Sequence, residues 1–311
     1  MNVRPTIIAA LQAAGLSLAG FLIPVLGQIA VLFVPVPLIT ATVLHGRRAG
    51  VSAMVIAAAL VAVIVSLHAA VVLFVLALGC MALAIAGGML RNLRHETIVL
   101  LGGLVPLVLL VIVLAPVFME AGKPPVAVAE EYLRTSLAES RELYTKMGLT
   151  EIVQSLDSFG ENVIFYAARL IPGIIITTTL MQALFCYGIA RAIVLRRRPD
   201  LPLAARPPLA LWHLPDQWVW GLIITLLLVA LPDPAARFTG LNLLCLCLLA
   251  YTVQGTALVD HFLRKVRIPT LMRSVLHAII LTLPSVVAVI ALGVVDIWAD
   301  FRKVRTPLVK S

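Results

Sequence analysis

An arginine inside an apolar stretch is the residue of this sequence best suited to bind a ligand. Arg169 lies between residues 160 and 190, and Pro172 follows it by one turn, which indicates a helix distorted near a cavity. A guanidinium there can hold an anionic group. The other interpretations are that Arg169 extends toward lipid headgroups or pairs with Glu161. The candidate ligand-binding residues are Arg169, Tyr166, Asn162 and Gln182.

Further polar side chains interrupt the apolar stretches. Gln182, Asn242 and Gln254 serve either as hydrogen-bonding groups between helices, which we favour, or as ligand contacts. Asp260 and His261 lie where an apolar stretch meets Arg264 and Lys265, and an ion pair at the membrane boundary is the default interpretation there.

Patterns for catalysis, phosphate binding and metal binding do not occur in the sequence. It contains no Walker A, HExxH or GxSxG motif, and its six histidines are scattered. Its four cysteines fall inside apolar stretches, where cysteine acts as a small hydrophobic residue. We therefore predict no catalytic residue, no metal ligand and no cofactor, and we do not expect an enzyme. The cysteines are Cys80, Cys186, Cys245 and Cys247.

The elements that carry these residues are predicted to be transmembrane helices. Hydrophobic residues make up 61% of the 311 residues and charged residues 13%, about half the charged fraction of a soluble domain. Several apolar stretches approach the roughly 20 residues that a helix needs to cross a bilayer. We predict an all-α polytopic transmembrane helix bundle with eight or nine membrane segments, within a range of seven to ten. Nominal segments are 6–23, 25–44, 51–67, 69–90, 97–118, 160–190, 217–231, 238–260 and 274–295.

The net charge of +9 indicates topology and not a nucleic-acid partner. Basic residues gather in alternate short gaps between the apolar stretches, and such gaps face the cytoplasm. We expect a multi-pass protein of the bacterial inner membrane, with the lipid bilayer as partner and the N-terminus in the cytoplasm. The basic residues in these gaps are Arg47, Arg48, Arg91, Arg94, Arg191, Arg196, Arg197, Arg198, Arg206, Arg264, Lys265, Arg267 and Arg273.

The C-terminal tail conflicts with this topology. It is basic and by the same rule cytoplasmic, whereas a single crossing at 274–295 puts it outside. Because Pro284 lies in that stretch, Leu271 to Trp298 is either a broken or re-entrant pair of helices, or the segment count is wrong.

The one substantial polar stretch, residues 119–159, contains seven acidic and four basic residues. Apolar and small residues recur at three- and four-residue spacing after Lys123-Pro124-Pro125, which predicts an amphipathic helix. We favour a helix on the outer surface of the bundle; the alternative is a lid or a partner-docking element. The recurring residues are Leu133, Leu137, Ser140, Tyr144 and Met147.

The C-terminal region resembles a family of membrane proteins. The tail Leu292-Gly293-Val-Val-Asp296-Ile-Trp298-Ala-Asp300-Phe301-Arg302-Lys303, preceded by Gln254-Gly255, resembles the end of the YybS-like family of uncharacterised multi-pass membrane proteins. This resemblance implies a membrane protein and assigns no activity.

The first half has a second resemblance. Pro24-x-x-Gly27, Pro35-x-Pro37 and Leu44-His-Gly46-Arg-Arg-Ala-Gly50 look like the substrate-binding subunits of energy-coupling factor transporters, which borrow ATPases from separate chains. The resemblance implies that Arg169 lies near a ligand cavity and that Ala9 and Ala13 contact a coupling subunit. This sequence departs from the pattern by about three additional helices and a longer external loop.

Small residues in the first stretch also have an interpretation of their own. They allow close helix approach, either inside the bundle, which we favour, or against a second protein. These residues are Ala9, Ala10, Ala13 and Ala14.

Together these observations predict a six-helix transporter-like unit at 1–195, with the external stretch 119–159, a basic cytoplasmic linker at 196–206 and an appended helical unit at 207–311. The preferred function is to bind or transport a small ligand as a membrane subunit without its own ATPase. The alternative is a scaffold or assembly protein that does not transport and recruits cytoplasmic partners through its basic loops.

Overall fold

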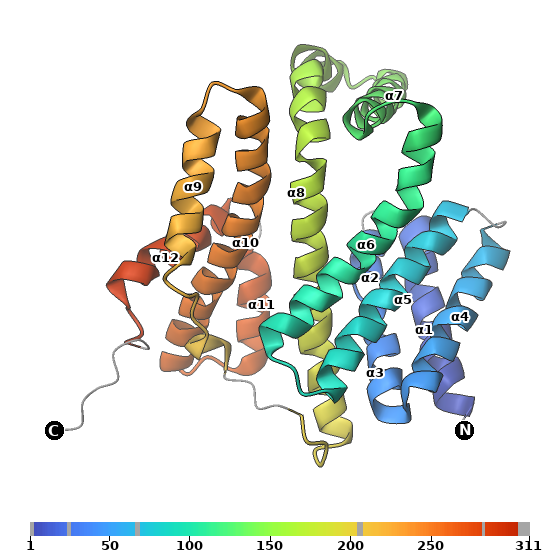
Figure 1. Ribbon diagram of the computed structural model, residues 1–311, viewed down its shortest axis with the longest axis vertical. Coiled ribbons are helices and arrows are strands. Elements are labelled where there is room, and N and C mark those ends of the chain that lie inside the picture. Colours follow the sequence, from blue (N-terminus) through green and yellow to red (C-terminus); the bar gives the residue numbers. More distant parts are fainter. Residues whose placement is uncertain (1–2, 24–25, 66–68, 204–207, 282–283, 304–311) are drawn as a thin grey trace. The chain divides into compact units, whose positions relative to one another are not determined.

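The computed structural model describes residues 3–23, 26–65, 69–203, 208–281 and 284–303 (Figure 1). Throughout these residues the regular elements are helices. Seven spans in them are long and apolar enough to cross a membrane, and α9 and α12 are shorter apolar helices. The predicted all-α polytopic bundle is confirmed. The helices are α1 (Val3–Leu22), α2 (Leu26–Val31), α3 (Pro35–His45), α4 (Arg47–Ile64), α5 (Ala69–Leu90), α6 (His95–Ala121), α7 (Pro125–Lys146), α8 (Thr150–Arg197), the 3-10 helix Leu209–Leu211, α9 (Trp218–Ala230), α10 (Pro234–Lys265), α11 (Thr270–Ile280) and α12 (Ser285–Ala299).

Two compact units divide the chain, and each is built from two separate parts of the sequence. Unit 1 comprises Met1–Val128 and Thr178–Ala205, and therefore contains α1 to α6 with the C-terminal part of α8. Unit 2 comprises Ala129–Thr177 and Arg206–Ser311, and contains most of α7, the N-terminal part of α8 and α9 to α12. The predicted organisation into a unit at 1–195, a basic linker at 196–206 and an appended unit at 207–311 stays a prediction.

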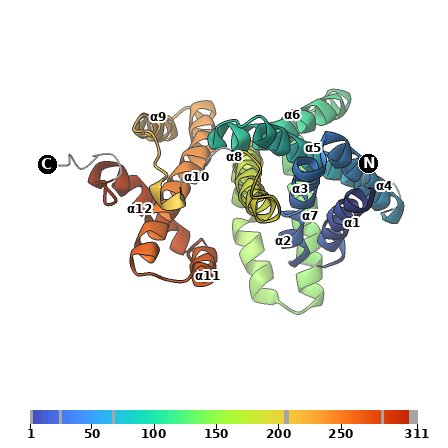
Figure 2. The ribbon, with the colours of Figure 1, turned by 90° about the horizontal axis from the view of Figure 1, so that it is seen from below.

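Small side chains allow α1 and α4 of unit 1 to pack closely. Ala9 and Ala13 of α1 are 5% and 0% exposed and belong to the core of the unit, as do Ala53 and Ala57 of α4. Figure 2 shows α1 and α4 side by side. The preferred interpretation, internal packing, is confirmed. The contact with a separate coupling subunit that the transporter resemblance implied is wrong for Ala9 and Ala13, because their side chains are covered within unit 1.

Two predicted segments are each divided into two helices. The segment at 25–44 forms α2 and α3, which together still make one candidate span, Gly27–His45. In the last segment α11 ends at Ile280 and α12 begins at Ser285, directly after Pro284. Proline lacks the backbone donor that a continuous helix needs at this point. The broken pair of helices is therefore confirmed, and a single continuous helix is wrong.

Unit 2 is organised around α10. Asp233 caps its N-terminus, since the carboxylate accepts a hydrogen bond of 2.7 Å from Ala236 N. Farther along, α10 approaches α12 at two glycines. A Cβ at Gly255 would lie 1.9 Å from Val289 O, and one at Gly293 would lie 2.2 Å from the α10 backbone. Only glycine allows this close crossing.

The predicted amphipathic helix in the polar stretch is confirmed as α7. The chain turns before it at Gly122, whose φ of 61° lies in the left-handed region. Leu133 and Leu137 of α7 are half-buried, whereas no described residue of α7 is fully buried. Helix α7 is therefore covered on one side only.

Candidate functional site

Arg169 of α8 is held by groups of unit 2. Its Nη1 donates to Glu130 Oε1 of α7 at 2.6 Å and to the Phe165 carbonyl oxygen at 2.9 Å. The guanidinium carbon lies 3.7 Å from the centroid of the Phe165 ring, a cation–π arrangement. The predicted pairing of Arg169 with Glu161 is wrong, because the Glu161 carboxylate accepts from Arg134 at 3.0 Å. The charge of Arg169 is thus compensated inside the protein.

Helix α8 is much longer than one membrane crossing requires. The helix has 48 residues, which at a rise of 1.5 Å gives about 72 Å, more than twice the roughly 30 Å of hydrocarbon. Counting roughly 20–25 residues back from Leu195, beside the terminal arginines, reaches residues 171–176. A crossing counted from that end of α8 therefore stops short of Arg169, and α8 is longer than one crossing requires.

Of the other candidate ligand-binding residues, Tyr166 lies in the same cluster as Arg169. Its ring centroid is 5.5 Å from that of Phe165 and 5.8 Å from that of Phe238. Asn162 is exposed on α8. Gln182 belongs to unit 1, where its Nε2 donates to the Leu32 carbonyl oxygen at 3.2 Å. Arg169 and Tyr166 are brought together, and Gln182 has a structural contact of its own.

Asn242 of α10 binds the backbone of α8 just after Arg169. Its Oδ1 accepts from Gly173 N at 2.6 Å, and its Nδ2 donates to the Arg169 carbonyl oxygen at 2.9 Å. In a regular α-helix this N–H and this C=O pair with each other. Gly173 permits the approach, since a Cβ there would lie 2.7 Å from Asn242 Oδ1. The expectation that Asn242 bonds between helices is confirmed.

A second cluster of unit 2 joins the residues quoted for the YybS-like resemblance. Asp296 Oδ2 accepts from Gln254 Nε2 at 2.6 Å and from Arg302 Nη2 at 2.7 Å, and the Arg302 and Asp296 side chains are 1% and 2% exposed. Arg302 Nη1 also donates to the Ala210 and Trp212 carbonyl oxygens. The cluster therefore ties the segment before α9 to α10 and the end of α12.

Sequence reasoning assigned no role to this ion pair, although it had marked the residues. The sequence feature that could have indicated the pair is Asp296 and Arg302 six positions apart, on either side of the end of α12. A boundary ion pair was predicted where Asp260 meets Arg264 and Lys265. The structure pairs Asp260 with Arg264 at 2.7 Å, and Arg273 adds a second cation at 3.6 Å.

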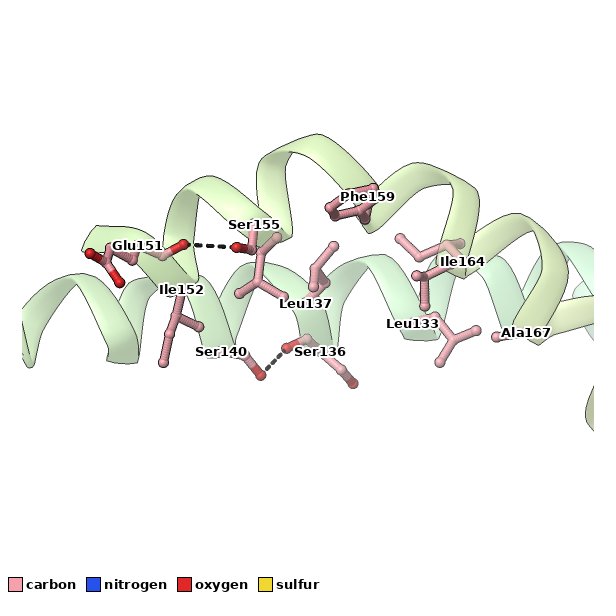
Figure 3. A pocket seen from close by; sticks show the side chains of 13 residues that line it. Leu133, Ser136, Leu137, Ser140, Glu151, Ile152, Ser155, Phe159, Ile164 and Ala167 are labelled. Atoms are coloured by element: carbon pink, nitrogen blue, oxygen red, sulfur yellow. Dashed lines mark hydrogen bonds between the residues drawn. The ribbon is translucent and has the colours of Figure 1, made fainter. Parts of the chain in front are cut away.

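A groove lies between α7 and the first part of α8 in unit 2. It has a volume of about 560 Å³. Figure 3 shows side chains of both helices lining it, with Leu137 between them. The hydroxyls of Ser140 and Ser155 donate to backbone carbonyl oxygens of their own helices, so these donors do not require a hydrogen-bond partner from a bound molecule. The lining residues are Leu133, Ser136, Leu137, Ser140, Glu151, Ile152, Ser155, Leu156, Phe159, Gly160, Val163, Ile164 and Ala167.

This groove suits apolar side chains more than chemistry on a substrate. Within the described residues, no three His, Cys, Asp or Glu side chains are placed to hold a metal ion. The groove has one acidic residue, Glu151, at one end. Arg169, the predicted ligand-binding arginine, does not line the groove and is paired with Glu130. Two neighbouring helices form the walls of the groove, and a third helix can pack into a groove of this kind.

Comparison with known proteins gives one match. The model of a family described as "Predicted membrane protein (DUF2232)" matches residues 12–297. No curated protein and no solved structure matches the chain.

Proposed function

We propose that this protein is a membrane scaffold that docks a partner protein on the groove between α7 and α8. The premise is that the chain belongs to the DUF2232 family of predicted membrane proteins. The partner element that fits is an amphipathic helix with basic residues beside its apolar face. The single observation that carries the proposal is the open apolar groove between α7 and the first part of α8.

The exposure of apolar side chains on the hairpin of α7 and α8 supports docking. Ile152 and Phe159 line the groove, yet their side chains are 41% and 65% exposed. Soluble surfaces rarely expose contiguous apolar area without a partner. A third helix seated along the groove would cover these side chains and complete a three-helix arrangement.

The charge of the hairpin selects a basic partner. Residues 119–159 have a net charge of −3 in a chain whose net charge is +9. Glu151 is exposed and lines one end of the groove, so the acidic charge nearest to the apolar side chains comes from this residue. Complementary charge increases the association rate and disfavours acidic partners. The proposal assigns no catalysis to the chain, and the orientation predicted from the basic gaps puts the partner on the outer side of the membrane.

Photo-cross-linking in the cells that make the protein tests this proposal. A benzophenone amino acid replaces Ile152 in the groove or, as a matched control, Leu143, which is 56% exposed on α7 but does not line the groove. We expect one protein adduct at position 152 and not at 143, and the cross-linked peptide should lie in a basic amphipathic helix. Phe159→Asp should abolish the adduct.

Three outcomes would contradict the proposal. Adducts to lipid alone would make the groove a membrane-contacting surface. Equal adducts at both positions would mean that the groove has no selectivity. An adduct whose peptide is acidic or lies outside a helix would refute the stated chemistry of the partner.

A second candidate, binding of a small anionic ligand, is favoured by the surroundings of Arg169. Its guanidinium lies among aromatic rings, and the Glu130 carboxylate that it binds stands where a ligand carboxylate could replace it. The resemblance of the first half to transporter subunits supports this candidate from the sequence alone. If the chain transports the ligand, a separate ATPase or coupling subunit supplies the energy.

A thermal-shift screen of small anions distinguishes the two candidates. A ligand at 100 times its dissociation constant adds about 2.7 kcal/mol to the free energy of unfolding. Binding at this site predicts a shift that Arg169→Ala removes and that Arg134→Ala, at the exposed pair with Glu161, leaves intact. A shift that survives Arg169→Ala would assign the ligand to another site.

A further inference from the structure

Unit 1 has a groove of its own on α1, and a polar residue lies in it. The groove has a volume of about 510 Å³ and is otherwise apolar. Gln12 and Gly15 of α1 are both exposed, and a Cβ at Gly15 would meet no atom within 4 Å. The lining residues are Leu11, Gln12, Gly15, Leu16, Phe33, Val36, Pro37 and Ile189.

Gln12 occupies the middle of a membrane span. Helix α1 has 20 residues, and Gln12 is the tenth of them. At 1.5 Å per residue α1 is about 30 Å long, which matches the hydrocarbon thickness, so the amide lies near the bilayer centre. Within the described part of the chain, this amide has no hydrogen-bond partner.

A lipid chain cannot satisfy this amide, because hydrocarbon offers neither donor nor acceptor. Polar side chains at this depth normally bond to another helix. The glutamine amide has two donors and one acceptor oxygen, so two copies of it can bond to each other in both directions. A two-fold symmetric interface places the same residue opposite itself.

We propose that the groove around Gln12 and Gly15 is a dimer interface between two copies of this chain in the membrane, with the two Gln12 amides hydrogen-bonded across the two-fold axis. Gly15 lies one turn after Gln12 and has open space around it, which allows the partner's backbone to approach closely. Leu11 and Leu16 flank the amide and supply the surrounding apolar contact. This interface is independent of the groove between α7 and α8.

Subunit counting in liposomes tests the proposal. The full chain carries one fluorophore at its C-terminus, and photobleaching steps are counted as the protein is diluted in lipid. We expect wild-type protein to form dimers and Gln12→Leu to raise the dissociation constant by roughly threefold to thirtyfold, the range of one interhelical amide pair. Gly15→Leu fills the groove and should abolish the dimer.

Gly87→Leu of α5 is the matched control, because a Cβ there also meets no atom within 4 Å. It should dimerise as the wild type does. Monodisperse elution of each variant in detergent checks folding, and Gln12→Leu is expected to fold because its apolar side chain faces lipid. The proposal is overturned if wild-type protein stays monomeric at every dilution, if Gln12→Leu dimerises as tightly as wild type, or if Gly87→Leu weakens the dimer equally.

Discussion

Replacing Arg302 by methionine should destabilise unit 2 more than any other single loss of charge considered. The Arg302 and Asp296 side chains are 1% and 2% exposed and lie 2.7 Å apart. After the substitution, Asp296 keeps its bonds from Gln254 Nε2 and Phe301 N but has no cation. Removing one partner of a buried pair costs about 3–5 kcal/mol, because the other charge stays buried.

A double substitution separates this pairing from the loss of packing. Asp296→Asn keeps an acceptor for its neighbours but leaves the Arg302 cation without a carboxylate, so alone it should also cost several kcal/mol. Combined with Arg302→Met it removes both charges. The double variant should therefore lose less than the sum of the single losses, by roughly 1–3 kcal/mol, the usual coupling of residues in one network.

Unfolding in detergent with a thiol-reactive dye measures these losses. Cys186 and Cys247 are buried and become reactive when the chain unfolds. A loss of several kcal/mol should lower the midpoint on the order of 10 °C. Arg198→Met, at a fully exposed pair, should leave the midpoint unchanged. A midpoint of Arg302→Met within about 1 °C of the wild-type midpoint would refute the reasoning. Strictly additive losses in the double variant would refute it as well.

Three further predictions concern single positions. Asn242→Leu should cost about 1–3 kcal/mol by removing the bonds to the α8 backbone, and hydrogen exchange should accelerate there. Gly255→Ala should destabilise the crossing of α10 and α12, whereas Gly221→Ala, whose Cβ meets only a sulfur at 3.9 Å, should be neutral in the same unfolding assay. Hydrogen bonds from Arg198 lower the pKa of Asp200, so the pair is intact above the ordinary aspartate pKa and lost as pH falls through the lowered value. Arg198→Gln should raise that pKa in a carboxyl NMR titration.

The sequence predicted those features that depend on neighbours along the chain. Leu133 and Leu137 are four residues apart, so their periodicity was enough to identify α7. Pro284 indicated the break between α11 and α12 because its effect on a helix is local. The helical class followed from apolar stretches of bilayer length, since a chain in lipid has few other ways to satisfy its backbone.

Contacts between distant residues could not be predicted in this way. For Arg169 the sequence suggested Glu161, eight residues away, but two turns of helix separate them by about 12 Å. The actual partner, Glu130, is 39 residues away on another helix. Gln254 and Asp296 are separated by 42 residues, and a single sequence contains no measure of such a distance. The same limit left the grooves unpredicted.

The interleaving of the two units has a consequence for synthesis. Unit 2 begins at Ala129, yet α10 leaves the ribosome only after the last part of unit 1 has been made. Between Gly173 and Asn242 the ribosome adds 69 residues, which takes roughly 3–14 s at about 5–20 residues per second. During that interval the α8 backbone around Gly173 is already made but lacks its amide partner. All of unit 1 has therefore been made once residue 205 is added, whereas unit 2 waits for α9 to α12. A gene cut after residue 205 would yield two products that each lack part of unit 2.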